Sequence, residues 1–335
     1  QVLADLGAEV IKIERPDGGD DTRAWKPPVS AGNSAYFGAV NRNKRSVTLD
    51  FGSEQGREVF YNLVSKSDVV IQNFRPGVTE RLGIDYETVK PYRPDIIYCS
   101  ISGFGQEGPL SRRAAYDYIV QAYSGLMSLT GEVDGDPVRC AGAVADYGSG
   151  MWSVIGILYA LMERQRTGKG QHIDLSMLDC TLTYVNHLAS QFMAGGDPPE
   201  RVANGHASIA PMDVYKTQDG PLMVVCGNDG MFKRLAQCLG APELAEDPRF
   251  AKNADRAKNL GELQELVRSL FATDTQKSWE KRLSEADIPV APVRTIPEVM
   301  AADEMRDRSM IIELTDAEGQ PVRLVGSPLK MSESA

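Results

Sequence analysis

The chain has 335 residues, of which 42% are hydrophobic and 24% are charged, and its formal net charge is -10. This length allows one large domain or two ordinary ones, and the composition is that of a globular protein. The negative charge argues against nucleic acid as a partner, and no apolar run is long enough to span a bilayer, so no membrane role is expected.

The first hundred residues alternate short apolar runs with a helical pattern. Strands are predicted over residues 9–14, 46–51, 68–73 and 95–101. Ser53 is expected to cap a helix over residues 54–65. Continuous apolar strands interleaved with helices predict a doubly wound, Rossmann-like α/β fold. Because the chain opens on Val2–Leu6, which has the pattern of a helix tail closed by Gly7, we expect the natural N-terminus to be missing.

Longer helices dominate the next hundred residues. Helical patterns run over residues 116–127, 148–165 and 177–193, with a Gly/Asp-rich loop at 131–137 and a strand at 171–176. The second of these helices ends at the glycine stop of Thr167–Gly170. Together with the first hundred residues, these elements predict a large α/β domain over residues 1–195.

A change of composition predicts a second, smaller domain. Residues 196–210 are polar and rich in Gly and Pro, as in a linker. Residues 211–305 then predict an α+β domain, with a hairpin around Asp219–Gly220 and helices over 259–271 and 275–285. Residues 306–335 are expected to return toward the large domain, and the C-terminus is expected to be truncated.

Several familiar sites are missing from the sequence. It contains no GxGxxG after a strand, no phosphate loop, no GxSxG and no HExxH. The five cysteines are widely spaced without a CxxC pair, which predicts neither a metal site nor a disulfide framework and favours a reducing, cytoplasmic location. Of the three histidines, only His206 lies in a loop typical of a functional site. We therefore expect no metal and no permanently bound cofactor.

Asp146 is the most informative carboxylate in the chain. It lies in a stretch of small residues, Ala141–Gly150, directly before a long apolar helix. At such a boundary a carboxylate meets the positive end of the helix dipole, and the glycines let a ligand approach the backbone. The same features fit an ordinary helix cap, because Asp is a favoured capping residue. Local evidence alone favours the cap.

The chain as a whole resembles a class III CoA-transferase, the group that includes formyl-CoA transferase, carnitine CoA-transferase and α-methylacyl-CoA racemase. The matching stretches are collinear over nearly all of residues 1–310. They include LADLGAEVIKIERPDGGDDTR, NRNKRSVTLDF, DVVIQNFRPGVTERLG, YDYIVQAYSGLMSLTG and ADYGSGMWSVIGILYALMERQRTGKGQHIDLSMLD. The resemblance implies an α/β large domain with a small domain, and a homodimer whose two chains interlock.

The resemblance also implies a mechanism and a binding site. Asp146 takes the place of the family's nucleophile, which attacks an acyl-CoA thioester to give an aspartyl mixed anhydride and then an aspartyl-CoA thioester. A carboxylate needs no general base for this chemistry. The amides of Gly148–Gly150 could donate to developing negative charge. The resemblance implies CoA contacts at Arg23, Arg42, Lys44 and Arg81 for the phosphates, Asn73, Phe74 and Arg75 beside the nucleotide, and Tyr116 at the thioester.

Two other functions stay open, as does the acceptor acid. A racemase of this family has a His where this chain has Tyr116, and a non-catalytic CoA-binding protein would not need Asp146. Arg201, His206 and Lys216 could pair with a second carboxylate, so a dicarboxylate such as succinate is the expected acceptor. The loop Gly227–Gly230 has only two glycines, fewer than formyl-CoA transferase, which argues against formate or oxalate.

Overall fold

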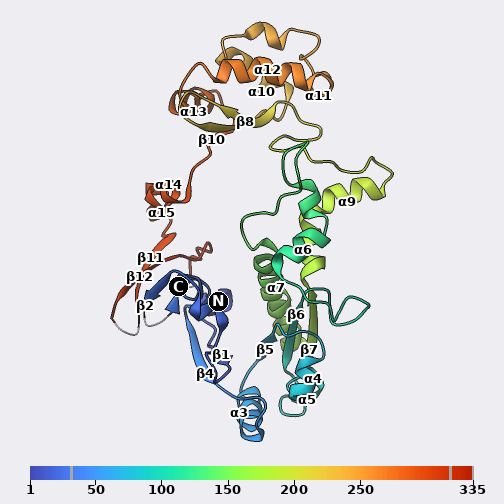
Figure 1. Ribbon diagram of the computed structural model, residues 1–335, viewed down its shortest axis with the longest axis vertical. Coiled ribbons are helices and arrows are strands. Elements are labelled where there is room, and N and C mark those ends of the chain that lie inside the picture. The colour runs from blue at the N-terminus through green and yellow to red at the C-terminus, as the bar shows by residue number, and fades with distance from the viewer. Residues whose placement is uncertain (31–32, 317–318, 334–335) are drawn as a thin grey trace. The chain divides into compact units, whose positions relative to one another are not determined.

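The computed structural model describes residues 1–30, 33–316 and 319–333. The chain forms two compact units (Figure 1). The large unit comprises residues 1–127, 139–198 and 302–335, and the small unit comprises residues 128–138 and 199–301. Unlike the predicted division at 195, 210 and 305, this one gives the loop at 128–138 to the small unit. Residues 317–318 and 334–335 of the predicted return segment lie outside the described residues.

The parallel strands of the large unit lie in two sheets. Strands β5 (Val69–Gln72), β6 (Ile97–Ser102) and β7 (Gln171–Ser176) form a parallel sheet in that order. Strands β1 (Val10–Glu14) and β4 (Lys44–Thr48) form a separate parallel pair. The α/β class is confirmed by these strands. The single doubly wound sheet stays a prediction, because the described residues do not join the two sheets.

Helix α3 (Glu54–Val64) shows how local sequence starts an element in this unit. The hydroxyl oxygen of Ser53 accepts a hydrogen bond from the amide of Gly56 at 3.0 Å, as expected for an N-cap. Phe60 and Val64 on one face of the helix are buried with Ile96 and other apolar residues next to β6. Burial of this apolar face holds the helix to its unit.

Three helices that pack together contain the candidate site. Helix α6 (Asp117–Tyr123) is shorter than predicted and is followed by a 3-10 turn, η2 (Leu126–Leu129). Helix α7 (Val144–Thr167) begins four residues before the predicted start at 148. The helix predicted over 177–193 is divided into α8 (Met177–Leu182), the 3-10 turn η3 (Thr183–Val185) and α9 (Asn186–Met193).

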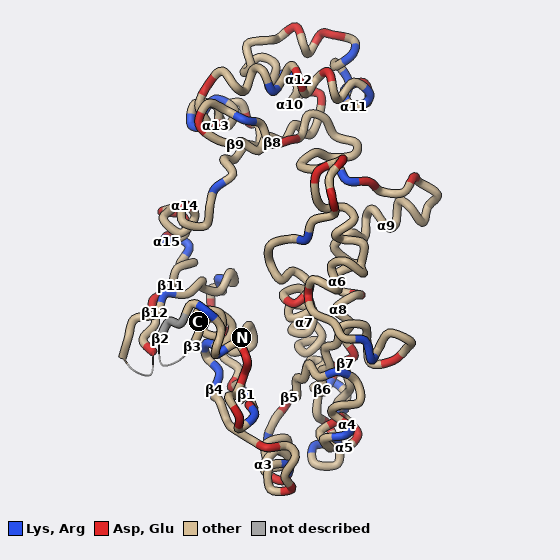
Figure 2. Tube along the Cα trace, in the orientation of Figure 1, with Lys and Arg blue, Asp and Glu red and all other residues tan. Residues whose placement is uncertain are grey.

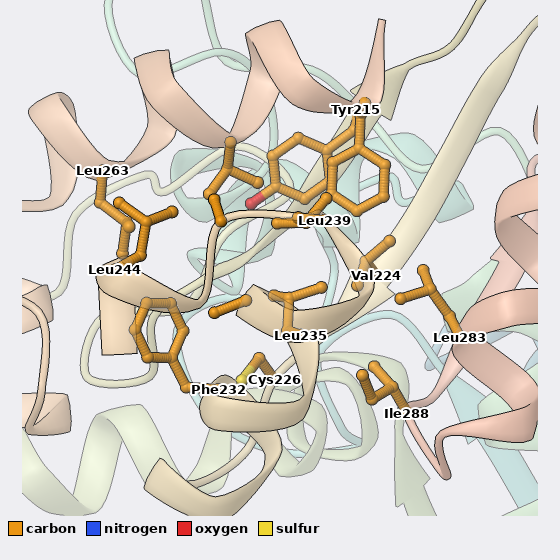
Figure 3. Packing of buried hydrophobic residues seen from close by; sticks show 14 of the residues in the cluster. Tyr215, Val224, Cys226, Phe232, Leu235, Leu239, Leu244, Leu263, Leu283 and Ile288 are labelled. Carbon is orange, nitrogen blue, oxygen red and sulfur yellow. The ribbon is translucent and has the colours of Figure 1, made fainter. Parts of the chain in front are cut away.

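The small unit has its own core (Figure 3). The antiparallel strands β8 (Met212–Lys216), β9 (Pro221–Val225) and β10 (Val290–Pro292) form a sheet in the order β10-β9-β8. Helices α10 (Asp229–Cys238), α12 (Leu260–Phe271) and α13 (Gln276–Glu285) bury their apolar faces with this sheet. The predicted hairpin and the two predicted helices are therefore present.

Arg201 explains why the loop at 128–138 belongs to the small unit. Its guanidinium donates to the carbonyl oxygens of Ser128 at 3.1 Å, Glu132 at 3.1 Å and Gly135 at 2.7 Å. These three bonds tie the loop to residues that follow position 199 in the chain. The link joins positions about seventy residues apart, so no local pattern predicts it.

The remaining elements are short. In the large unit they are α1 (Val2–Asp5), η1 (Asp21–Ala24), β2 (Pro28–Ser30), β3 (Asn33–Ser34), α2 (Ala35–Asn41), α4 (Val78–Leu82), α5 (Tyr86–Val89), α15 (Asp303–Asp307), β11 (Ile311–Thr315) and β12 (Pro321–Val325). In the small unit they are η4 (Pro242–Ala245), α11 (Asn253–Lys258) and α14 (Ile296–Ala301). Strands β11 and β12 form an antiparallel hairpin. No helix among the described residues is long and apolar enough to cross a membrane.

Candidate active site

Asp146 is the third residue of helix α7, inside its first turn. The N-cap position belongs to Ala143, so Asp146 is not the capping residue that its sequence context favours. Its side chain is exposed, and among the described residues no hydrogen bond to its carboxylate is present. From Tyr147 to Met162 the helix has no charged residue, and the tube is accordingly tan there in Figure 2. Asp146 is therefore an isolated carboxylate with free lone pairs.

The carboxylate that caps α7 comes from another helix. Asp117, the first residue of α6, is buried, with 5% of its surface exposed. Its Oδ2 atom accepts hydrogen bonds from the amides of Ala145 at 2.8 Å and Asp146 at 3.2 Å. These two N–H groups have no partner within α7, because the first turn of a helix leaves its amides unpaired. Asp117 satisfies them across 28 and 29 residues of chain, which explains the early start of α7.

Gln121 holds Asp117 and the loop before α7 together. Its Nε2 atom donates to Oδ1 of Asp117 at 2.5 Å, and its Oε1 atom accepts from the amide of Cys140 at 2.9 Å. The same Nε2 atom lies 3.4 Å from the carbonyl oxygen of Gly142. Gln121 is fully buried. One side chain thus fixes the cap and both ends of the segment that leads to Asp146.

Apolar packing between the helices supports this polar network. Val120 of α6, Ala145 of α7 and Met177 of α8 are buried against one another, each with less than a tenth of its surface exposed. Helices α6, α7 and α8 are therefore held together at the level of Asp146. A site built on packed helices keeps its geometry better than one built on loops.

Electrostatics around Asp146 favour a basic carboxylate. Desolvation by the surrounding protein, and then the negative charge of Asp117, raise the pKa of Asp146 from 3.8 to about 6. Tyr36 of α2 lies close to this carboxylate. Burial, and then the negative charges of Tyr147 and Asp146, raise the pKa of Tyr36. At neutral pH Asp146 is still mostly ionised, and it is more basic than an ordinary aspartate.

The glycines after Asp146 are explained by packing within the chain rather than by the approach of a ligand. A Cβ atom at Gly148 would overlap the hydroxyl group of Tyr184, so this glycine makes room for a side chain of the same chain. Residues 148–150 lie within α7, where the amides are used in the hydrogen bonds of the helix itself. The expectation that these amides donate to a developing negative charge is therefore wrong for this geometry. Only Gly150 has open space at its Cβ position.

The predicted phosphate contacts near the N-terminus are already paired. Arg23 donates to both carboxylate oxygens of Glu14 at 2.8 and 2.6 Å and lies 3.9 Å from the ring centre of Phe37. Its hydrogen bonds, with those of Ser46 and Asp20, lower the pKa of Glu14 to about 2. Arg23 keeps 28% of its side chain exposed, which leaves an open edge.

Arg42 and Lys44 are more enclosed. Arg42 donates to both oxygens of Asp5 at 2.9 and 2.6 Å and to the carbonyl oxygen of Val325 at 2.5 Å, and its side chain is 9% exposed. All three nitrogens of its guanidinium are therefore used within the chain. Lys44 donates to Oδ1 of Asn41 at 2.8 Å, and burial lowers its pKa.

The predicted nucleotide residues are open to solvent. Asn73, Phe74 and Arg75 follow β5 at the carboxyl end of the parallel sheet, where α/β proteins commonly bind ligands. Asn73 donates to the carbonyl oxygen of Ile101 at 2.7 Å, and Phe74 is 41% exposed. Arg75 and Arg81 are exposed and have no ion pair with any described residue.

Tyr116 belongs to the large unit, whereas the residues expected to bind the acceptor belong to the small unit. Tyr116 occupies the N-cap position of α6 with 78% of its surface exposed, one residue before the buried Asp117. His206 and Lys216 are exposed in the small unit. Arg201 uses its guanidinium on the 128–138 loop, so it is not free to bind a carboxylate in this arrangement.

Comparison with known proteins identifies the family. A sequence model described as CoA-transferase family III matches residues 1–335, the whole chain. The chain belongs to this family. The predicted resemblance is thereby confirmed, and the protein is an enzyme that transfers CoA. CoA-transferases use CoA thioesters as substrates, and the relatives of this chain are named for carboxylic acids.

Relatives and a solved structure agree with this assignment. The acetyl-CoA:oxalate CoA-transferase of Acetobacter aceti is 43% identical over 332 residues, covering 99% of this chain and 84% of the relative. The succinate–glutarate CoA-transferase of Agrobacterium fabrum is 41% identical over 345 residues, covering 100% of this chain and 85% of the relative. The crystal structure of a CaiB/BaiF family protein from Brucella suis has a TM-score of 0.88 at 42% identity, covering 100% of this chain and 88% of that one.

Sequence reasoning missed two residues of the site. Asp117 stands next to Tyr116 within the matching stretch YDYIVQAYSGLMSLTG, yet it was not expected to contact the start of α7. Gln121 follows one helical turn later, on the same face of α6 as Asp117. That i, i+4 spacing of Asp and Gln was the signal available in the sequence.

Proposed function

We propose that this family III CoA-transferase moves CoA from an acyl-CoA thioester to a dicarboxylic acid through covalent intermediates on Asp146. A carboxylate oxygen of Asp146 attacks the thioester carbonyl, and the C–S bond breaks to give an aspartyl mixed anhydride and the CoA thiolate. The thiolate then attacks the aspartyl carbonyl, forms an aspartyl-CoA thioester and releases the donor acid as a carboxylate.

The acceptor completes the exchange by the same two steps in reverse. Its carboxylate attacks the aspartyl-CoA carbonyl, which gives a second mixed anhydride and frees the thiolate. Thiolate attack on the acceptor's carbonyl forms the new acyl-CoA and returns Asp146 as a carboxylate. No proton is taken up or lost in any step, so the site needs no general base.

The single observation that carries this proposal is the state of Asp146. Its carboxylate is exposed, lacks a hydrogen-bond partner among the described residues and has a pKa raised to about 6 by desolvation and by Asp117. A carboxylate that is still ionised at neutral pH but poorly stabilised by its surroundings is a better nucleophile than a solvated or ion-paired one.

For CoA itself, the exposed cations are the strongest candidates. Arg75 and Arg81 are open to solvent and unpaired among the described residues, so a phosphate can bind without breaking an internal contact. Arg23 can contribute through its exposed edge while it remains bonded to Glu14. Asn73 and Phe74 are proposed to border the nucleotide, Lys44 to add positive charge, and Tyr116 to line the thioester. Arg42 is the weakest candidate because Asp5 occupies it.

The acceptor is proposed to be a small dicarboxylic acid. Relatives of this chain are named for oxalate and for glutarate, and both acids have a second carboxylate. In the small unit His206 and Lys216 are exposed and can meet such a group, whereas Arg201 is engaged. Because one relative is named for oxalate, the two glycines of Gly227–Gly230 do not remove that acid from the candidates.

An apolar face of α7 supports the proposal of a homodimer. Large apolar side chains recur at helical spacing along this face and are more than two-fifths exposed: Tyr147, Met151, Ile155, Leu158, Tyr159 and Met162. A contiguous apolar face of this kind is typical of a protein–protein interface. We infer that a second copy of the chain covers it, as the interlocked dimer of the family implies.

Asp146→Asn tests the proposed role of the carboxylate. The amide keeps the shape of the side chain but cannot form the anhydride, so exchange should fall by several orders of magnitude. Succinyl-CoA is incubated with isotope-labelled glutarate or oxalate, and labelled acyl-CoA is measured by mass spectrometry. Glu54→Gln, which removes a carboxylate from the first turn of α3, is the matched control and should be unaffected. Near-normal exchange by Asp146→Asn would point to direct transfer between bound substrates.

A further inference from the structure

Asp117 and Gln121 lie where they control the backbone of the nucleophile. Asp117 accepts from the amide of Asp146 itself and from that of Ala145, at 3.2 and 2.8 Å. Gln121 binds the other oxygen of Asp117 at 2.5 Å and the amide of Cys140 at 2.9 Å. Both side chains are buried, and neither has a part in the chemistry described above. Their contacts converge on one short segment of chain.

The reactivity of Asp146 depends on which group accepts hydrogen bonds from the first amides of α7. The free amides at the start of a helix are good donors to an anion. If the amides of Ala145 and Asp146 were unoccupied, the side chain of Asp146 could rotate to accept from them. A carboxylate that accepts two such bonds is stabilised and loses nucleophilicity. Because Asp117 takes both amides, the lone pairs of Asp146 stay free.

We propose that Asp117 and Gln121 are positioning residues, which anchor the first turn of α7 and keep its free amides away from the Asp146 carboxylate. This inference rests on the proposed function, because it assigns to Asp117 and Gln121 the task of preparing Asp146 as the nucleophile. Neither residue touches the reacting atoms. Asp117 supplies the cap and a fixed negative charge, and Gln121 locks the cap to the loop before α7.

The two contributions of Asp117 can be separated by substitution. Asp117→Asn keeps an oxygen that accepts from the two amides, but it removes the charge and places an NH2 group against Nε2 of Gln121, so the bond to Gln121 is lost as well. Asp117→Ala removes both and releases the amides. Gln121→Leu keeps the buried volume but breaks the link to Asp117 and to the amide of Cys140. Ser53→Ala is the matched control, because it removes an N-cap of α3 in the same unit.

The expected result is a loss of rate without a loss of binding. In Asp117→Ala, kcat for succinyl-CoA and glutarate should fall about 100-fold, as misplacement of a reacting group causes, while both KM values stay close to those of the wild type. Gln121→Leu should show a smaller loss of about tenfold. Asp117→Asn keeps the cap but loses the bond to Gln121, so its rate should fall by about tenfold, less than in Asp117→Ala. Ser53→Ala should lower the melting temperature without changing kcat.

The pH dependence of kcat/KM adds a measurement that would not change if Asp117 had only a structural role. The ionisable groups that the structure describes around this end of α7 include Asp117 and Tyr118 of α6, Tyr36 of α2, Tyr147 of α7, Cys180 of α8 and Tyr184 of η3, and Arg139 lies over the ring of Tyr118 at 4.3 Å. Among these described groups, Asp117 is the carboxylate that adds a negative charge beside Asp146. The acid limb of kcat/KM should therefore move to lower pH in Asp117→Asn, because the charge that raises the pKa of Asp146 is gone.

The deciding experiment follows the covalent step alone. Each variant is mixed with succinyl-CoA and quenched with hydroxylamine, which labels an activated carboxylate. The label on the peptide that contains Asp146 is then measured over time, and circular dichroism confirms folding. Slow labelling in Asp117→Ala, with clearly faster labelling in Asp117→Asn, supports the inference. Labelling of a folded Asp117→Ala at the wild-type rate, with an unmoved acid limb, overturns it while leaving the proposed function intact. A wild type that acquires no label overturns both.

Discussion

Asp146→Asn should make the protein more stable while it removes activity. The pKa of Asp146 is raised from 3.8 to about 6, first by desolvation and then by Asp117. A shift of that size corresponds to about 3 kcal/mol against the charged form. The side chain is exposed, so solvent screening reduces this value, and the dipole of α7 opposes it. We therefore expect a gain of about 1 kcal/mol, or about 2 °C in melting temperature, for the neutral amide.

The sign of the pH dependence follows from the direction of the shift. The folded pKa lies above the unfolded one, so the charged Asp146 costs stability fully above pH 6 and not at all below 3.8. The advantage of Asp146→Asn should be full well above pH 6 and should vanish as the pH falls toward 3.8. Calorimetry at one fixed protein concentration measures both values.

Asp5→Asn is a control of opposite sign. Although desolvation pushes the pKa of Asp5 upward, the hydrogen bonds and charge of Arg42 outweigh it, and the pKa is lowered. Its charge therefore contributes stability above the ordinary value of 3.8, which is lost as the pH falls through the lower folded pKa. Asp5→Asn should lower the melting temperature at neutral pH. If Asp146→Asn also lowered it, or if its advantage did not change with pH, the account of Asp146 as a desolvated anion would be refuted.

Three further outcomes are expected. Arg81→Ala should weaken CoA binding about ten- to a hundredfold in calorimetry, because a charge-assisted phosphate bond is lost. Arg166→Ala, which removes another exposed arginine, should leave CoA binding unchanged. Equal affinities of the two variants for CoA would remove Arg81 from the site. Arg256→Ala should destabilise the protein by about 3 kcal/mol in urea, since this fully buried arginine bonds two carbonyl oxygens and Asp229; an unchanged midpoint would contradict this role. In heavy water a 2-methylacyl-CoA should acquire no deuterium at its α-carbon, because Tyr116 offers no imidazole that could remove the α-proton near neutral pH; wash-in would favour the racemase.

Elements set by local patterns could be predicted from the sequence. Strand β7 occupies residues 171–176 as predicted, because a glycine stop ends the helix before it and the short run alternates polar residues with Ile173 and Leu175. Helix α3 follows its Ser53 cap for the same reason. The resemblance to the family, carried by long collinear stretches, was confirmed over the whole chain.

Features made by distant contacts could not be predicted. Helix α7 starts early because Asp117, 28 residues before Ala145, binds its first amides. The 128–138 loop belongs to the small unit because Arg201 binds its carbonyl oxygens. Arg42 was expected to meet a phosphate, but Asp5 occupies it. In each case a side chain finds its partner across the fold, and the sequence pattern near that residue does not record the partner.

In the proposed mechanism Asp146 becomes covalently bonded to substrate. The protein is incubated with succinyl-CoA, quenched with hydroxylamine or borohydride, digested and searched by peptide mass spectrometry for modified carboxylates. We predict one modified peptide, with the change at Asp146, and its absence from Asp146→Asn. A modification at Asp117 instead, or rapid CoA exchange without any modified peptide, would contradict the account.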